Sequence, residues 1–512
     1  MKNLGIFLTL AFAVFFAVVW GEDQPFNGIP DGVDCIATLW CGSKTGVCST
    51  VCEKGSVVID AWQKYAMSTQ IKLSRMHGLC YSQFLGTHNS GIDKSDGYGN
   101  GDPLLDPIME KLVEITGNED IRWETSNHYL TLTDQLNLGM RHIELDTHWI
   151  FQELSIAHCG GVGFDQIDEA IANINEKLAE KTSKQIKWDS ESIGCFPSGS
   201  MIFSKDQRSF DSAVQEMSDW FGENEDQFVI IMLDVQHEEG NWNSSQSMLA
   251  VFDKYFEGKY YTPTTLQDED GSVFPSVNEL SGRGYQLLIS TTKDLGDDMT
   301  SSIFTRDMVC GWNEANVDEL NEYPTCSYYD SDNEVVMNEG TFTRVVSSEI
   351  QYGPLNEGGH LGNDWPVLDE DSIPDVVKCN TGLLAGDNMV TSRARAAIWS
   401  WRENEPNNMV SAEQSEMCVV LNGNDGRWSS LDCSSTSPQA VLCFTKDDSP
   451  YGSYSILSLS GGNSYEDASQ VCTENGYDEV GTPGTAFINA KLTDQMNEQE
   501  AQLDQLWIGW KI

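Results

Sequence analysis

Continuous apolar runs separated by longer segments constrain the fold of this chain most strongly. Between about residues 76 and 395 the runs read "YSQFLGTH", "MRHIELD", "SMIFS", "FVIIMLD", "YQLLIST", "FTRVVSSEI" and "TGLLAG". Several do not alternate in polarity, as is typical of strands buried on both faces of a parallel sheet. The intervening stretches include helical patterns such as "FDQIDEAIANINEKLAEKT". This alternation predicts an α/β fold, specifically a distorted (β/α)8 TIM-type barrel.

The first 21 residues have the pattern of a secretion signal. Lys2 precedes the apolar run "LGIFLTLAFAVFFAVVW", and Gly21 precedes acidic "EDQ". A membrane anchor is the alternative, because the run approaches the length that spans a bilayer. Polar sequence follows at once and favours the signal, so we expect a secreted, extracellular protein.

The fourteen cysteines of the chain favour disulfide bonds, because their number is even and an exported protein meets an oxidising environment. Residues 22–75 form a Cys-rich N-terminal segment. A zinc site is the alternative there, but the segment has no CxxC pair, so a small cross-linked cap is the better interpretation. The cysteines of this segment are Cys35, Cys41, Cys48 and Cys52.

The net charge of −49, from 79 acidic and 30 basic residues, excludes whole classes of partner. Nucleic acid is not expected, because its phosphates would be repelled. Passive attraction to an anionic membrane is disfavoured for the same reason. Dense carboxylates suit a medium rich in calcium, although simple solubility explains most of them.

Polar side chains follow several apolar runs, where the strands of a barrel would end. Residues two apart on a strand share a face, so Glu144 and Asp146 point the same way and repel each other unless a cation or proton lies between them. Asn89 and Asp234 end two other runs, and barrel strands converge at their carboxyl ends. Oxygen ligands suit a hard divalent cation. The sequence therefore predicts a calcium shell of Asn89, Glu144, Asp146 and Asp234.

Two histidines, His88 and His158, would flank this shell, since each also lies near the end of an apolar run. A lone histidine is more often structural than catalytic. An exposed strand edge with solvated acids is likewise the simpler interpretation of Glu144 and Asp146 alone. The combination of five segments favours a site.

The motifs "GTHNSG", "QLNLGMRHIELD" and "AHCGG" resemble the catalytic X region of phosphoinositide-specific phospholipase C. The resemblance covers about residues 82–160 and continues more weakly through Asp234 to Lys293. It implies a distorted β/α barrel, catalytic roles for His88 and His158, and Lys293 as a contact to substrate phosphate, with an ordinary surface lysine as the alternative. The calcium ligands that it implies are Asn89, Glu144, Asp146 and Asp234.

Two positions refine the resemblance. Asp234 stands where the family usually has Glu, one methylene longer. Asp146 stands where metal-independent bacterial relatives carry arginine, so the chain resembles the calcium-using type. Arg141 has the opposite strand parity and is interpreted as structural.

The resemblance also implies a reaction. The inositol 2-hydroxyl of a phospholipid at a membrane surface would attack phosphorus, and Glu144 or Asp234 would accept its proton. His88 would stabilise the pentacovalent phosphorus, and His158 would protonate the departing diacylglycerol oxygen. The expected product is a cyclic inositol phosphate.

Residues 396–512 resemble a C-type lectin-like domain, a small disulfide-bonded α+β fold. "IWSWRENEPNNMVSAEQSEMCVVLNGNDGRWSSLDC" resembles its second half, and "NSYEDASQVCTENGYDEVGTPGTAFINAKL" with "LWIGW" resembles its first half. The reversed order predicts a circular permutation, or else one incomplete domain followed by the start of another. The resemblance implies the disulfide bonds Cys418–Cys433 and Cys443–Cys472.

The same resemblance argues against calcium-mediated sugar binding. The EPN triplet that begins at Glu405 is present, but Ser429 and Ser430 replace the Asn-Asp pair of sugar-binding relatives. Carbohydrate stays only an alternative partner, and the ligand of this region is unknown from the sequence.

Two other hypotheses remain. One is a barrel enzyme of the glycerophosphodiester phosphodiesterase or phospholipase D toxin type, whose first motif is His-Arg-Gly rather than His88-Asn89-Ser90. The other is a catalytically silent lectin-like surface protein, against which the complete histidine and acid set argues. The domain boundaries that we expect are 1–21, 22–75, 76–395 and 396–512.

Overall fold

The structure is a computed structural model in which part of the 512-residue chain is described. The expected signal, the run "SMIFS" and most of the "FDQIDEAIANINEKLAEKT" helix lie outside the described residues. Within the described ranges, every helix is too short or too polar to cross a membrane. The described residues are 26–41, 48–97, 126–150, 153–157, 173–174, 176–177, 208–236, 244–330, 333–337, 342–348, 351–352, 355–356, 367–406, 416–447, 452–460, 464–498 and 503–512.

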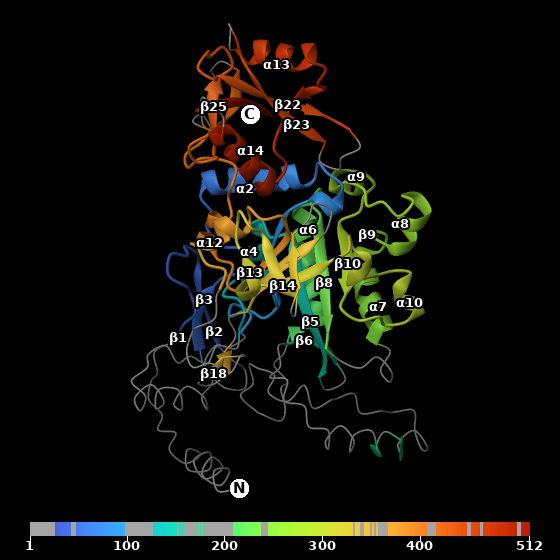
Figure 1. The fold of residues 1–512 in the computed structure, drawn as a ribbon. Helices are drawn as coiled ribbons and strands as arrows, with labels where there is room; N and C mark the ends of the chain where they lie inside the picture. Colours follow the sequence, from blue (N-terminus) through green and yellow to red (C-terminus); the bar gives the residue numbers. More distant parts are fainter. Residues whose placement is uncertain are drawn as a thin grey trace.

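A curled sheet of parallel strands forms the centre of the molecule (Figure 1). Its strand order is β11-β10-β8-β5-β4-β19-β16-β12, and every neighbouring pair along this path is parallel. Helices pack on its outside, so the prediction of an α/β, TIM-like fold is confirmed. The strands are β4 (Phe84–Thr87), β5 (His142–Ile150), β8 (Val229–Val235), β10 (Leu287–Thr291), β11 (Phe304–Thr305), β12 (Asn313–Asn316), β16 (Thr343–Ser347) and β19 (Thr381–Gly386).

The sheet has an open edge between its terminal strands β11 and β12, which are not hydrogen-bonded to each other among the described residues. Side chains span this edge instead. Arg306, which follows β11, forms an ion pair with Glu314 of β12. Glu314 Oε1 also accepts a hydrogen bond from the Arg344 guanidinium of β16 at 2.6 Å. Charged side chains therefore connect three strands where the backbone ladder is interrupted.

The helices outside the sheet follow ordinary amphipathic rules. In α6 (Phe210–Glu223) the buried face includes Ala213, Val214, Met217 and Phe221, three or four residues apart. Ser209 caps its N-terminus by accepting from the Ser212 N–H at 3.2 Å. The other helices of this region are α4 (Leu132–Asn137), α7 (Ser244–Phe256), α8 (Pro263–Glu269), α9 (Val277–Gly282), α10 (Asp297–Thr300), α11 (Ile373–Val376) and α12 (Thr391–Ala396), with 3-10 helices at Leu79–Tyr81, Arg306–Met308 and Val317–Glu319.

Short strands complete the barrel region. β6 (Glu153–Ile156) pairs antiparallel with β5 and with β7 (Arg208–Ser209), and β9 (Tyr260–Tyr261) pairs parallel with β10. Two small sheets lie apart from the main one. They contain β13 (Leu320–Asn321), β14 (Ser327–Asp330) and β15 (Asn333–Val336), and β17 (Gln351–Tyr352) and β18 (Leu355–Asn356).

The N-terminal segment forms a cross-linked three-stranded sheet of β1 (Phe26–Asn27), β2 (Ala37–Cys41) and β3 (Cys48–Cys52). It is held by the disulfide bonds Cys35–Cys52 and Cys41–Cys48. The backbone N–H groups of Gly55 and Val57 donate to the buried Asp134 carboxylate. This segment is therefore tied to the barrel. Two further disulfide bonds, Cys80–Cys310 and Cys326–Cys379, connect distant parts of the barrel region.

A separate mixed sheet forms the C-terminal region, in the order β21-β20-β25-β22-β23, with β24 paired to β22. Helix α2 (Ala61–Ser74) lies between this region and the barrel (Figure 1). The Gln70 side chain of α2 accepts from the Trp399 N–H at 2.7 Å, and Trp62 Nε1 donates to the Arg402 carbonyl at 2.8 Å. The elements are β20 (Met417–Asn422), β21 (Trp428–Asp432), β22 (Ala440–Thr445), β23 (Ser453–Ser458), β24 (Glu479–Val480), β25 (Gln505–Lys511), α13 (Tyr465–Glu474) and α14 (Ala486–Glu498).

Strand β4 approaches β5 so closely that only glycine fits at position 86. A Cβ on Gly86 would lie 2.5 Å from the His142 Cβ and 2.6 Å from its carbonyl oxygen. We expect Gly86→Ala to lower the free energy of unfolding by about 1–3 kcal/mol, because the two strands must separate. Gly222→Ala is the matched control, since nothing lies within 4 Å of its Cβ, and helix propensity should raise stability by about 0.5–1 kcal/mol. Urea unfolding measures both changes, and equal effects would contradict the close approach.

Candidate active site

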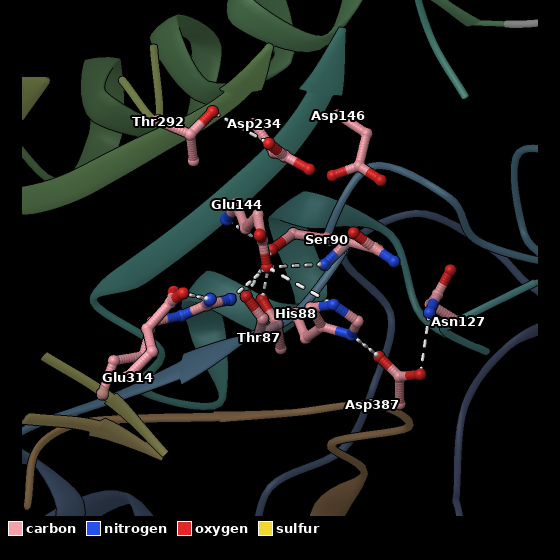
Figure 2. A network of polar contacts seen from close by, with 12 residues as sticks. Thr87, His88, Ser90, Asn127, Glu144, Asp146, Asp234, Thr292, Glu314 and Asp387 are labelled. Atoms are coloured by element: carbon pink, nitrogen blue, oxygen red, sulfur yellow. Dashed lines mark hydrogen bonds and ion pairs between the residues drawn. The ribbon is translucent and has the colours of Figure 1, made fainter. Parts of the chain in front are cut away.

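Three carboxylates meet on two neighbouring strands, two within β5 and one near the carboxyl end of β8. Glu144 and Asp146 share a face of β5, and Asp146 is the register partner of Asp234 on β8. One oxygen from each side chain lies within 4.8 Å of the others (Figure 2). The structure therefore brings these three acids together, and their role as metal ligands stays a prediction.

Neutral donors hold two of these acids in place. Gln236 Nε2 donates to Asp146 Oδ2 at 3.2 Å and to Asp234 Oδ2 at 2.7 Å. Thr292 Oγ1 donates to Asp234 Oδ1 at 2.9 Å, as Figure 2 shows. The orientation of Asp234 is therefore fixed by side chains from two strand ends.

The electrostatics of the cluster favour a bound cation. Burial raises the pKa of Asp146 well above its usual range, and the neighbouring Asp234 and Glu144 carboxylates raise it further. Burial also raises the pKa of Glu144, although Arg344 and His88 act in the opposite direction. Crowded carboxylate oxygens are the ligands that hard divalent cations prefer. The donor set therefore fits calcium by its chemistry.

A buried guanidinium contacts the cluster, and the sequence did not reveal it. Arg344, 3% exposed at its side chain, forms an ion pair with Glu144 Oε2 and contacts Glu314 through its other nitrogen. It comes from β16, on the other side of β4 and β19 from β5. The absence of arginine at position 146 therefore does not mean that the cluster lacks a guanidinium.

His88 lies between two carboxylates (Figure 2). Its Nδ1 is 3.0 Å from Asp387 Oδ1, and its Nε2 is 3.9 Å from Glu144 Oε2. Since a carboxylate oxygen accepts, Nδ1–H donates to Asp387, which leaves Nε2 directed at the acid cluster. Burial acts to lower the pKa of His88, but Glu144 and Asp387 outweigh it, so the pKa is raised and the cationic form is favoured.

Asp387 is a functional residue that the sequence interpretation missed. Its Oδ2 accepts from Asn127 Nδ2 at 2.7 Å, and it follows β19 directly. The signal was present, because "TGLLAGD" is an apolar run ending in an acid, the same pattern as "FVIIMLD". The side chain orients the His88 ring.

Asn89 lies beside the cluster in a left-handed backbone conformation, with φ at 48°. Its backbone N–H donates to Glu144 Oε2 at 3.3 Å. The adjacent Ser90 Oγ accepts from the Glu144 N–H at 2.9 Å. The turn after β4 therefore fixes Glu144 through backbone groups, and the expected role of the Asn89 amide oxygen as a ligand stays a prediction.

The other predicted residues differ in where the structure places them. His158 lies outside the described residues. Lys293 is exposed at the end of β10, so its phosphate contact stays a prediction. Arg141 donates to the Leu136 and Met140 carbonyls, as a structural residue would. His142, the neighbour of Arg141, is fully buried against Trp312 and belongs to the core.

The C-terminal region contains the disulfide bonds Cys418–Cys433 and Cys443–Cys472. The second joins β22 to α13. Glu405 Oε2 accepts from both the N–H and the Oγ of Ser430, at 3.1 and 2.6 Å. This carboxylate, the first residue of the EPN triplet, is therefore engaged by the protein itself.

Comparison with known proteins gives only remote similarity. No protein-family model matches the chain, and no curated protein matches it. A phosphatidylinositol-specific phospholipase C from Listeria monocytogenes is 14% identical over 67% of this chain and 98% of its own, with a TM-score of 0.36. A phosphatidylinositol-specific phospholipase C from Staphylococcus aureus, containing pentafluorophenylalanine, is 10% identical over 66% of this chain and 99% of its own, with a TM-score of 0.38. At these values the function must be argued from the site itself.

Removal of the Asp387 charge should change the titration of His88. We expect Asp387→Asn to lower the pKa of His88, because one of the charges that raise it is lost. In the wild type, the stability that His88 gains from its partners is complete below about pH 6.5 and is lost as the pH rises through its raised folded pKa. The Asp387→Asn variant should lose this stability at a lower pH than the wild type does. NMR of the His88 ring measures the shift, with the surface variant Asp211→Asn as control, and an unchanged titration would show that Asp387 does not act on His88.

Proposed function

We propose that the protein is a secreted, calcium-dependent phosphoric diester hydrolase that cleaves inositol phospholipids. One observation carries this proposal. His88 is held between Asp387 and Glu144, beside three converging carboxylates on the parallel strands β5 and β8. A histidine that favours its cationic form next to carboxylates provides both a donor and acceptors for phosphoryl transfer.

The side chains of this chain can divide the proton transfers between them. Glu144 or Asp234 would accept the proton of the inositol 2-hydroxyl as that oxygen attacks phosphorus. His88 would donate from Nε2 to a phosphoryl oxygen and stabilise its growing charge. His158 would protonate the departing diacylglycerol oxygen. The bond to diacylglycerol breaks as the cyclic phosphodiester forms.

The expected metal ligands are Asn89, Glu144, Asp146 and Asp234. Calcium, when bound, would supply positive charge beside the phosphoryl oxygens and lower the pKa of the attacking hydroxyl. Gln236 and Thr292 would keep two of the ligands oriented, as outer partners of metal ligands generally do. Lys293 would add a contact to substrate phosphate.

Two features support the extracellular setting. The described part of the chain contains six disulfide bonds, which persist in oxidising compartments. The N-terminal sequence has the pattern of an export signal. The substrate would then be met at a membrane surface outside the cell.

The C-terminal region has a separate proposal. We infer that residues 396–512 form a permuted C-type lectin-like domain, supported by its two disulfide bonds and by β25, which lies between β20 and β22 in one sheet. The hydrogen bonds from Ser430 to Glu405 argue against calcium-mediated sugar binding in this region, because they occupy a carboxylate oxygen that calcium would need. We therefore assign it a binding or structural role without a defined ligand.

Product analysis tests the proposed activity. Vesicles that contain phosphatidylinositol and phosphatidylcholine are incubated with the protein, with and without a calcium chelator. We expect cyclic inositol phosphate and diacylglycerol only when calcium is present, and a loss of at least about 100-fold in His88→Ala, because general acid–base groups contribute roughly that factor or more. His77→Ala is the matched control, since a Cβ added at Gly484 would lie 2.3 Å from His77 Nε2, which places this histidine against the C-terminal region.

The alternatives predict different results. Release of choline from phosphatidylcholine would favour the phospholipase D toxin type. No turnover of any phosphodiester by a folded, calcium-loaded protein would favour a silent surface protein. Full activity in chelator would remove the calcium dependence.

A further inference from the structure

We propose that Arg344 is a permanent counter-ion of the carboxylate cluster, which occupies one oxygen of Glu144 and restricts the site to a single divalent cation on the side of Asp146 and Asp234. This inference rests on the proposed function, because it concerns the same metal site. It assigns a role to a residue of the run "FTRVVSSEI", to which the sequence analysis gave no part in the site. Arg344 is a positioning residue, since it acts through Glu144.

The contacts of Glu144 carry the first step. Its Oε2 atom takes the ion pair with Arg344 and the N–H of Asn89 at 3.3 Å, and it lies 3.9 Å from His88 Nε2. Three donor groups therefore surround this one oxygen. A metal ion beside Oε2 would meet the positive charges of Arg344 and His88. The other oxygen, Oε1, is therefore the one able to face a cation.

The contrast with the other two acids carries the second step. Gln236 and Thr292 donate to Asp146 and Asp234 from uncharged groups. Neutral donors orient a carboxylate without cancelling its charge. Arg344 pairs with Glu144 and Glu314, so its positive charge reduces the negative potential most on the Glu144 side of the cluster.

The charge balance carries the third step. Three carboxylates with one guanidinium and a cationic His88 leave a single negative charge, which one divalent cation more than neutralises. Glu314 modulates this balance from the other side of Arg344, where it contacts Nη1 at 2.6 Å and also pairs with Arg306. Removal of Glu314 would leave more of the Arg344 charge directed at the site, whereas removal of Arg344 would leave Glu144 fully charged.

Calcium calorimetry on the full chain tests the inference through affinity, independently of turnover. We expect Arg344→Gln to bind calcium about tenfold more tightly, because a cation near the site is lost, and Glu314→Gln to bind several-fold more weakly. The double variant should return close to the wild-type affinity, since the two charge changes cancel. Opposite signs in the two single variants are the expected signature.

A purely structural role predicts another pattern. If Arg344 only fastens β16 to β5 and β12, both single variants should lose thermal stability with no opposite change in affinity, and that result overturns the inference. Arg344 is buried, so Arg344→Gln can fail to fold. In that case Glu314→Gln decides alone, together with Arg344→Lys, which keeps the charge and should bind calcium nearly as the wild type does. An unchanged affinity in Glu314→Gln would refute the role of Arg344.

Failure of the proposed function gives a distinct result. Wild-type protein that shows no heat of calcium binding would contradict the metal site itself. Wild-type protein that binds calcium, with variants that bind it equally well, would contradict only the role of Arg344.

Discussion

Repulsion between buried carboxylates is the constraint on which the active-site region depends. Glu144 and Asp146 are buried and Asp234 lies beside them, and burial together with these neighbouring charges raises the pKa of Asp146. Such a cluster persists in a folded protein only if protons, cations or donors compensate it. The compensation comes from around the barrel: Arg344 from β16, the turn at Asn89 after β4, and Gln236 and Thr292 from the ends of β8 and β10.

The same constraint connects the site to the closure of the barrel. Arg344 reaches Glu144 on one side and Glu314 on the other, and Glu314 pairs with Arg306 across the open edge between β11 and β12. One chain of alternating charges thus runs from the candidate metal site to the point where the sheet is not hydrogen-bonded. Orientation of the clustered acids and closure of the barrel depend on shared side chains.

The sequence predicted the parts of this arrangement that are local. Runs such as "FVIIMLD" are apolar because both faces of the strand are buried, and strand parity brings Glu144 and Asp146 to one face. The strands β11 and β12 escaped prediction because they have two and four residues, and β12 reads "NEAN" without an apolar run. The Arg344–Glu144 pair joins residues 200 positions apart, and no local pattern reports such a contact. Asp387 could have been predicted, because it ends the apolar run "TGLLAGD" in the same way as Asp234 ends "FVIIMLD".

The position of a bound ion tests this account most directly. Crystals grown with calcium, measured at a wavelength where calcium scatters anomalously, would show where the ion lies. The account predicts one peak, with oxygen atoms of Asp146, Asp234 and Glu144 at about 2.3–2.6 Å and the Arg344 guanidinium still on Glu144. Crystals that show the three carboxylates together with no peak among them, at calcium concentrations that support turnover, would contradict it.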